Sequence, residues 1–529
     1  HFLDTYIGIY NKHFPFKILK PSRHSRKPWV TPKLLTMIHT KNNLYGRFLK
    51  SRDNVALEVF KKYRNQLTAM LKQAKKLYYV HMFSVDDMRR ADIIWRKLRC
   101  VVNYKPQTAT PLELNINNTR VSESDMTNAF NEHFVKSSTS SVSTPLASNA
   151  IEYMPVPLPN SIFLFPTDIT EVQNIFMSLK NSNSLDAYNM QIKPAKFVLD
   201  IQAPYLTHIF NLAFETGEFP AKMQLAKVSV LHKGGELGNI NNFRPLSILP
   251  VFSKPLEKLI SVRITSHLEK YSFITESQFG FRQNRSTEFA LLKQKELILK
   301  ALDNRLLTIG IFLDFSKAFG TINHDILLAK LTYFGIRGNT LMLLKSYLQH
   351  RTQFVVISNF KSHILNITSG VPQGSILGPL LFTIYINDIV NVNRDPDIEF
   401  IIYADDTSIF FPGRDINTLV AKCNNLLDKI NRWTTSNLLK LNSQKTKAII
   451  FSSSNIPVVI SSPVVLNNEE IEFVDKIKTL GIWFTKTMSW TAHVDYILSK
   501  LSKTVGLLIK FKSLLPQSVK LLLYSSLVY

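Results

Sequence analysis

The sequence predicts an α/β or α+β body that extends from about Phe210 to the end of the chain. Strand-like and helix-like segments alternate throughout this part, as they do when sheets and helices pack in layers. The composition, 45% hydrophobic and 19% charged, is that of a globular protein and excludes a disordered one. With 529 residues, the chain is long enough for several domains.

The charge of the chain is strongly basic and unevenly spread. Lys and Arg number 64 against 39 Asp and Glu, and residues 1–100 hold 22 of the basic residues but only 6 of the acidic ones. Such an excess indicates a polyanionic partner, of which nucleic acid is the commonest. An anionic membrane surface is the alternative, but no apolar run approaches the roughly 18–20 residues that a transmembrane helix needs.

Residues 1–105 are predicted to be a basic helical extension. Within them, residues 59–78 place apolar side chains at helical spacing, with lysines and arginines between them. The basic face is expected either to contact a nucleic-acid backbone or to be a solvated face that packs on a neighbour. Residues 106–165 are predicted to be a linker, because 136–150 is rich in Ser and Thr and 155–159 in Pro.

Two further helices are expected. One begins at the capping-box sequence TEVQ, residues 170–173, and continues to Leu179. The other covers residues 493–515, where lysines surround apolar residues at helical spacing. That second helix is expected either to follow a duplex backbone or to pack as an ordinary helix.

The cysteines and the chain ends bear on compartment and completeness. Cys100 and Cys423 are too few for a disulfide framework or a Cys-rich zinc site within the chain, and they indicate a reducing, intracellular compartment. No signal peptide opens the chain. Because it begins at His1 and ends at Tyr529 within a helical pattern, it is interpreted as a fragment.

Two adjacent aspartates interrupt a strand-forming run, FIIYADDTSIFF, at residues 400–411. Neighbouring side chains on a strand point to opposite faces, so Asp405 and Asp406 can converge only at a tight hairpin turn. Mg²⁺ would offset their repulsion, and a two-metal site needs a third carboxylate. Asp314 supplies one, because it ends a second strand of the buried type. Taken alone, the pair also fits an exposed turn, and Asp314 a helix cap.

Glycines lie between these acids, in SGVPQGSILGPLLF, where a backbone can approach a ligand closely. Together these segments resemble, in order, the motifs of the reverse transcriptases of non-LTR retrotransposons, the LINE-type and jockey-like elements. The resemblance covers about residues 225–485. Its other blocks are VSVLHKGGELGNINNFRPLSILPVFSKPLEKLI (228–260), ITESQFGFRQNRSTEFALL (274–292), LKLNSQKTKAIIF (439–451), VDKIKTLGIWF (474–484) and, more weakly, NSLDAYNMQI (183–192).

The resemblance implies a right-hand polymerase whose catalytic acids stand on an antiparallel, ferredoxin-like palm sheet. Residues 166–485 would be fingers and palm, and 486–529 a truncated thumb. The implied activity is RNA-directed DNA polymerase, which copies retrotransposon RNA by two-metal nucleotidyl transfer, primed at a DNA target. RNA template, DNA primer and deoxynucleoside triphosphates would be the partners, in cytoplasm and nucleus. Residues 1–105 resemble the segment that joins such enzymes to an endonuclease.

By the same resemblance, Asp314, Asp405 and Asp406 are the catalytic carboxylates. Together with Phe315 they would hold two Mg²⁺ ions, with Mn²⁺ as the alternative ion, and Asp406 would ligate less directly than Asp405. The implied nucleotide-binding residues are Lys233 and Arg244 on the triphosphate, Gln373 and Gly374 along the nucleotide, Phe319 under the sugar and Lys445 near the pyrophosphate.

One departure from the family and three rival interpretations accompany this assignment. Gly320 stands where the family usually has Asp, which favours a decayed copy, and a non-catalytic RNA-binding remnant is therefore one alternative. An RNA-dependent RNA polymerase is another, although Phe319 would crowd a ribose 2′-hydroxyl. A group II intron maturase is the third, which the sequence YADDTSIF and the linker region fit less well.

Overall fold

The structure, a computed structural model, describes residues 1–15, 27–83, 97, 115–116, 119–120, 122–136, 147–453, 459–510, 515 and 517–527. Its contacts divide the chain into a larger unit of residues 1–15 and 112–490 and a smaller unit of residues 16–111 and 491–529. Among the described residues, no helix is long and apolar enough to cross a membrane. Cys100 and most of the Ser/Thr-rich stretch, residues 137–146, lie outside the described residues.

The larger unit contains a five-stranded sheet with the strand order β14-β11-β5-β10-β9, called here the central sheet. Four of its strands, β11, β5, β10 and β9, are neighbours that pair antiparallel. Numbered by their order along the chain, they lie across the sheet as 4-1-3-2, which is the strand order of a ferredoxin-like fold. The expected α/β or α+β body is confirmed. The strands are β5 (Leu307–Leu313), β9 (Glu399–Tyr403), β10 (Asp406–Gly413), β11 (Lys447–Phe451) and β14 (Glu472–Phe473).

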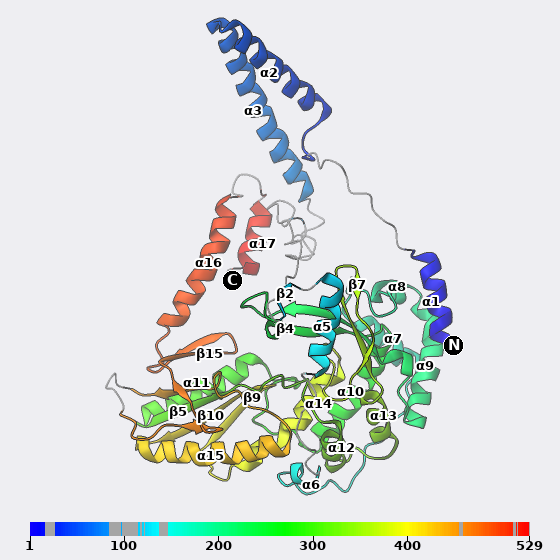
Figure 1. Cartoon of the computed structure of the whole chain (residues 1–529), viewed down its shortest axis with the longest axis vertical. Helices are drawn as coiled ribbons and strands as arrows, with labels where there is room; N and C mark the ends of the chain where they lie inside the picture. Colours follow the sequence, from blue (N-terminus) through cyan, green and yellow to red (C-terminus); the bar gives the residue numbers. More distant parts are fainter. Residues whose placement is uncertain are drawn as a thin grey trace. The chain divides into compact units, whose positions relative to one another are not determined.

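Alternating side chains of this sheet enter two different cores. Ile409 and Phe411 belong to a core that includes helix α15 (Ile416–Ser436), whereas Phe410 between them packs in a core with helix α11 (Thr287–Asp303). Figure 1 shows α15 along one face of the sheet and α11 along the other. A strand covered on both faces needs apolar residues on both, which explains the continuous apolar runs on either side of the two aspartates.

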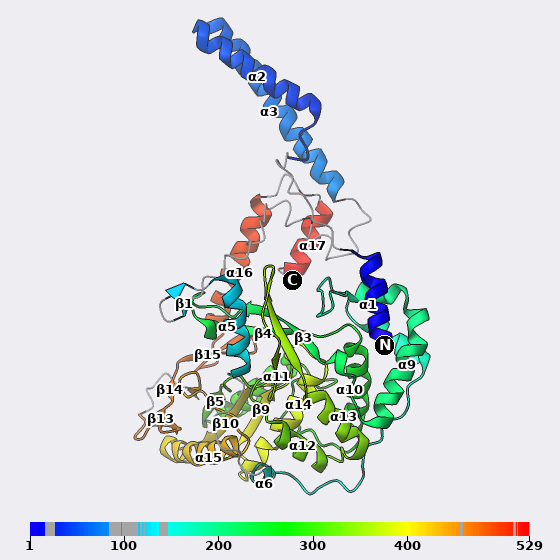
Figure 2. The same ribbon diagram turned by 45° about the vertical axis from the view of Figure 1, so that its right-hand side comes forward.

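A second sheet has the order β4-β3-β6-β7, with β8 also paired to β6. Its strands are β3 (Leu225–His232), β4 (Phe243–Ile248), β6 (Thr352–Ile357), β7 (Phe360–Lys361) and β8 (Leu365–Asn366). Helix α5 (Glu123–Lys136) lies against this sheet in both ribbon views (Figures 1 and 2). Phe130 and Phe134, one helical turn apart, are buried there. This part of the predicted linker is therefore a packed helix.

Several helices connect the strands of the larger unit. One of them, α7, bears on the predicted capping box. The predicted helix at TEVQ exists as α7, but its N-cap is Asp168, whose carboxylate accepts a hydrogen bond from the N–H of Glu171 at 2.8 Å. The predicted cap, Thr170, already lies inside the helix, because Asp168 has the same spacing to a following acidic residue. The helices are α1 (Phe2–His13), α6 (Ala147–Ala150), α7 (Ile169–Ser178), α8 (Ile192–Phe197), α9 (Leu199–Thr216), α10 (Ser253–Lys270), α12 (His324–Tyr333), α13 (Gly338–Leu348) and α14 (Leu377–Ile386).

A buried ion pair connects several of these helices. The ammonium of Lys330 on α12 lies 2.5 Å from Asp388, and both side chains are fully buried. Trp433 on α15 donates to the second oxygen of Asp388 at 3.0 Å, and Lys330 also donates to the carbonyl of Tyr385 at 2.7 Å. Since each buried charge is compensated by several partners, the pair fixes how α12, α14 and α15 pack under the sheet.

The smaller unit contains the hairpin of α2 (Pro32–Ser51) and α3 (Asn54–Met82) together with α16 (Thr491–Lys510) and α17 (Gln517–Leu527). α3 confirms the helix predicted over residues 59–78, and α16 confirms most of the one predicted over 493–515. Tyr79 and Phe83, at the end of α3, share a core with Val519 and Leu523 of α17. The contact units thus differ from the predicted domains, because the N-terminal hairpin and the C-terminal helices belong together.

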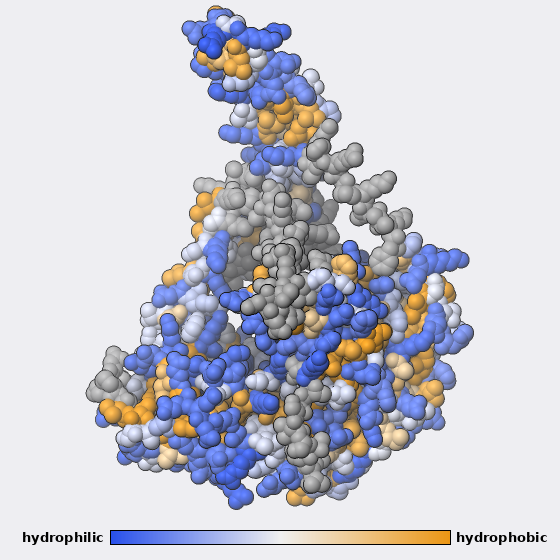
Figure 3. Space-filling view, in the orientation of Figure 1, coloured by the Kyte–Doolittle hydropathy of each residue, from blue (hydrophilic) through white to orange (hydrophobic). Residues whose placement is uncertain are grey.

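The α2–α3 hairpin carries much of the basic charge. Residues 27–83 include twelve Lys and Arg but only two acidic residues, Asp53 and Glu58. On the face that Figure 3 shows, the hairpin is mostly hydrophilic with smaller apolar patches. Buried side chains along it are few, since only Leu34, Leu67 and Tyr79 are fully buried among its described residues.

Candidate active site

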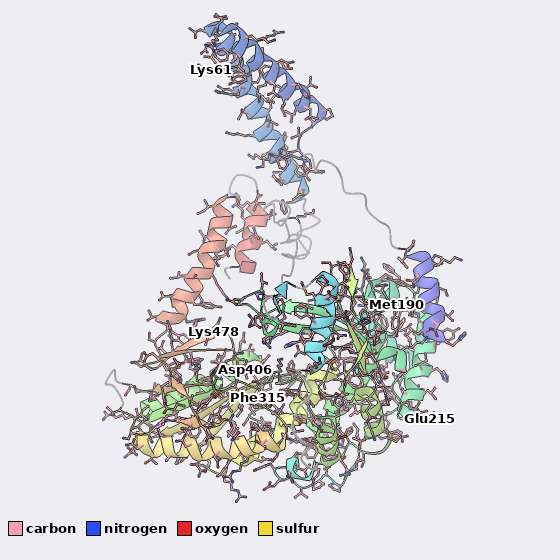
Figure 4. All side chains as sticks on the ribbon, viewed as in Figure 1. Lys61, Met190, Glu215, Phe315, Asp406 and Lys478 are labelled. Carbon is pink, nitrogen blue, oxygen red and sulfur yellow. The ribbon has the colours of Figure 1, made fainter. Side chains whose placement is uncertain are left out.

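The three predicted carboxylates lie at the same end of the central sheet. Asp314 directly follows β5, and Asp406 begins β10, where the next residue, Thr407, is paired with Leu313. Asp405 occupies the turn between β9 and β10, whose first residue, Ala404, has φ +58°. The predicted hairpin is therefore confirmed. Figure 4 shows Asp406 close to Phe315 at this end of the sheet.

The segment QFGF, residues 278–281, packs against this turn and forms hydrogen bonds with it. The side-chain oxygen of Gln278 accepts hydrogen bonds from the N–H groups of Ala404 and Gly280, at 3.2 and 2.8 Å. A side chain at Gly280 would be impossible without a shift, because its Cβ would lie 2.4 Å from the nitrogen of Ala404. Gln278 is only 1% exposed, so its side chain does not face the site's solvent-accessible side. Sequence reasoning assigned it no role.

The carboxylates disfavour one another's negative charge. Partial desolvation, followed by the charges of Asp405 and Asp314, raises the pKa of Asp406 to about 6, although its side chain still reaches solvent. Desolvation also raises the pKa of Asp314, and Asp405 adds to that effect while Lys445, Lys233 and Arg244 oppose it. A cation placed among these side chains would relieve both effects.

The carboxylate oxygens suit a hard divalent ion in their chemistry. Among the residues that the structure describes, however, no three His, Cys, Asp or Glu side chains are gathered closely enough to enclose an ion. The fit to a metal therefore rests on donor type and mutual repulsion. Phe315, whose ring is buried and whose backbone pairs with Leu441, has only its carbonyl oxygen to offer.

The predicted cations lie close enough to Asp314 to oppose the rise in its pKa. Lys233 follows β3, and Arg244 lies on the paired strand β4. Lys445 is brought close because the segment before β11 bonds to the chain at Asp314, where the N–H of Asn442 donates to the Asp314 carbonyl at 2.8 Å. All three cations act on the pKa of Asp314, which shows that they share one electrostatic environment.

A fourth cation, Lys317, belongs to the same cluster. The pKa of Lys233 is lowered by desolvation and then by Arg244, Lys445 and Lys317, so four positive side chains crowd together. Lys317 lies in the turn after Asp314 and has φ +52°. Sequence reasoning missed it, and its position three residues after Asp314 was the available signal.

The glycine-containing loop lies along β4. The N–H of Ser247 donates to the carbonyl of Gln373 at 2.8 Å, and a Cβ at Gly374, which has φ +113°, would lie 2.8 Å from the Ser247 carbonyl oxygen. The close approach that this glycine allows is thus to the chain's own backbone. Glu257, which is fully buried, accepts from the N–H groups of Ile376 and Leu377 at 2.8 and 3.3 Å and anchors the loop's far end.

Phe319 and Gly320 lie on the other side of this loop. The ring of Phe319 is half-buried and stacks on Phe382 at a centroid distance of 4.5 Å. Gly320 lies in a turn, so the penalty that a glycine carries inside a helix or strand does not apply there. A Cβ on Gly370, which has φ +79°, would lie 2.5 Å from the Gly320 carbonyl oxygen. The absence of a side chain at Gly370 therefore allows this backbone contact.

Comparison with known proteins identifies relatives. Residues 231–484 match the model of a family described as reverse transcriptase (RNA-dependent DNA polymerase). The RNA-directed DNA polymerase from mobile element jockey of Drosophila melanogaster is 28% identical over 353 residues, which cover 65% of this chain and 38% of that protein.

Two further Drosophila melanogaster proteins are similar. The probable RNA-directed DNA polymerase from transposon BS is 26% identical over 486 residues, 88% of this chain and 52% of that protein. The probable RNA-directed DNA polymerase from transposon X-element is 30% identical over 340 residues, 61% of this chain and 36% of that protein. The chain thus matches between about a third and a half of the length of these relatives.

Proposed function

The chain belongs, through the domain at residues 231–484, to the reverse transcriptases of non-LTR retrotransposons, and from this premise we propose that it copies retrotransposon RNA into DNA. Its enzyme class is RNA-directed DNA polymerase. Enzymes with this domain use divalent metal ions, an RNA template and nucleotides. The observation that carries the proposal is the meeting of Asp314, Asp405 and Asp406 with a cluster of cations at one end of the central sheet.

The acids and cations divide the work in this proposal. Asp314 and Asp405, with the carbonyl of Phe315 and less directly Asp406, would hold two Mg²⁺ ions. When bound, such ions lower the pKa of the primer 3′-hydroxyl and neutralise the triphosphate. Lys233, Arg244 and Lys445 would bind the phosphates, and Arg244 can do so with two parallel hydrogen bonds.

The neighbouring segments position the nucleotide. Gln373 and Gly374 would lie along it, because their loop is fixed to β4, the strand that carries Arg244. Phe319 would face the sugar with the part of its ring that the stack on Phe382 leaves exposed. A deoxyribose fits against such a ring, whereas a 2′-hydroxyl would meet an apolar edge. DNA is therefore the proposed product.

The larger architecture follows from the same proposal. The central sheet would be the palm, the β3–β4–β6 sheet with α5 the fingers, and α16 and α17 part of the thumb. The basic α2–α3 hairpin would contact nucleic-acid phosphates. Priming at a DNA target, and an endonuclease elsewhere in the full protein, are proposed by resemblance to the family.

The experiment is primer extension on an RNA template with deoxynucleoside triphosphates and Mg²⁺. The proposal expects template-length DNA that disappears when EDTA removes the ion. Binding of RNA without any extension would support the non-catalytic remnant instead. Extension with ribonucleotides in preference to deoxynucleotides would favour an RNA polymerase.

A further inference from the structure

Helix α5 is held rigidly against the sheet that carries two of the predicted phosphate-binding cations. Asn131, which is fully buried, donates to the Ser362 hydroxyl at 3.1 Å and to the His363 carbonyl at 2.8 Å, and it accepts from Gln353 at 3.0 Å. Phe130 meets Phe243, the neighbour of Arg244, edge-on at 5.0 Å. The orientation of α5 relative to Arg244 is therefore fixed by both polar and apolar contacts.

This anchoring brings the last turn of α5 to the nucleotide site. Phe134 and Val135 line a cavity of about 50 Å³ together with Gly320 and Gln373. His133, beside them, places its Nε2 atom 3.4 Å from the ammonium of Lys317. The two residues are 184 positions apart in the chain. α5 lies outside the residues that match the family model, 231–484, so nothing in that match assigns it a role.

In the contact between His133 and Lys317, the lysine ammonium donates and the imidazole accepts the hydrogen bond. Partial burial, followed by the positive charges of Lys317 and Lys233, lowers the pKa of His133 to about 4. The imidazole is therefore neutral near pH 7, and its Nε2 can accept a hydrogen bond from the ammonium. Without such an acceptor, repulsion between Lys317 and Lys233, whose pKa Lys317 lowers, would favour conformations in which Lys317 turns away into solvent.

We propose that His133 is a positioning residue for polyphosphate binding, because it holds the Lys317 ammonium within the cation cluster that faces Asp314. The ligand would be the triphosphate of the incoming nucleotide or the pyrophosphate product. This inference rests on the proposed function for the identity of the ligand. It adds α5, a helix outside the matched domain, to the parts of the chain that set nucleotide affinity.

A double-mutant cycle on the full chain tests the inference. Binding of a deoxynucleoside triphosphate and of inorganic pyrophosphate, each with Mg²⁺, is measured by calorimetry without primer or template. His133→Leu should weaken both by about tenfold, the order expected for one charge-assisted hydrogen bond. His133→Gln, which keeps a neutral acceptor, should restore most of the affinity. In a Lys317→Ala background, His133→Leu should have no further effect, because its partner is gone.

The control is His363→Leu, in the connection between β7 and β8, because His363 forms its hydrogen bonds to α5 through its backbone N–H and carbonyl, whereas its side chain is exposed. Its affinity should equal that of the wild type. An unchanged affinity in His133→Leu, or an equal loss in the Lys317→Ala background, would overturn the inference while leaving the polymerase proposal intact. Conversely, if the double-mutant cycle gives the expected result but the wild-type protein shows no primer extension, the polymerase proposal is refuted and the role of His133 stands. A His133→Leu protein that unfolds would leave His133→Gln and Lys317→Ala to decide, and weak binding by His133→Gln would then count against the inference.

Discussion

The raised pKa of Asp406 predicts that this carboxylate lowers the stability of the protein when no divalent ion is bound. The folded-state pKa is about 6, against an ordinary value of 3.8. Because the folded-state pKa is raised, the folded protein binds the proton more tightly, and the associated stability is fully present below about pH 4. It is lost as the pH rises through about 6.

The magnitude follows from the size of the shift. The shift of the Asp406 pKa by about two units corresponds to at most about 3 kcal/mol of stability, since each pKa unit is worth about 1.4 kcal/mol. The side chain of Asp406 reaches solvent, which screens the interaction, so we expect roughly 1 kcal/mol. Asp406→Asn should therefore raise the free energy of unfolding by this amount at pH 8, and the gain should vanish towards pH 4.

The assay is urea unfolding in EDTA at a series of pH values. Asp397→Asn is the matched control, because Asp397 is an exposed acid near the opposite end of the same hairpin, and it should show no such gain. Adding Mg²⁺ should reduce the difference between Asp406→Asn and the wild type, since an ion offsets the repulsion that the mutation removes. An Asn variant that is no more stable than wild type at pH 8 in EDTA would refute the electrostatic reasoning.

Three other variants test separate parts of the site and its support. Phe319→Val should raise ribonucleotide incorporation at least tenfold in single-nucleotide extension while affecting deoxynucleotides less. Equal ribonucleotide use by the variant and the wild type would contradict the role of Phe319 in excluding the 2′-hydroxyl. Lys330→Ala should destabilise the protein by about 3–5 kcal/mol in denaturant unfolding, because it leaves the Asp388 carboxylate buried and unpaired; a loss below 1 kcal/mol would contradict that view. Gly374→Ala should raise the KM for deoxynucleotides several-fold, because φ +113° disfavours any side chain there, and an unchanged KM would show that the loop adapts.

The sequence predicted the hairpin of Asp405 and Asp406 well because its signal is local. Two apolar runs on either side of Asp405 and Asp406 fit a tight turn between buried strands, and the structure has that turn. The meeting with Asp314 could not come from local pattern, because strand register depends on contacts across almost a hundred residues. It was expected only through the resemblance to a family.

Other features were hidden for identifiable physical reasons. α5 stands beside a Ser/Thr-rich stretch whose composition suggests a linker, although the spacing of Phe130 and Phe134 was a signal for a buried helical face. The contact of His133 with Lys317 joins segments 184 residues apart, which periodicity does not encode. The helix cap at Asp168 was missed because two overlapping capping patterns compete and only side-chain geometry decides between them.

The most direct test of the central claim, that the acids at the end of the central sheet catalyse DNA synthesis on RNA, is primer extension by Asp405→Asn. Asp397→Asn serves as the charge-matched control, and RNA binding is measured in parallel. We predict that Asp405→Asn binds RNA like the wild type but extends the primer at least a hundredfold more slowly, since a lost metal ligand removes several kcal/mol of transition-state stabilisation. Extension by Asp405→Asn within a few-fold of the wild-type rate would contradict the claim.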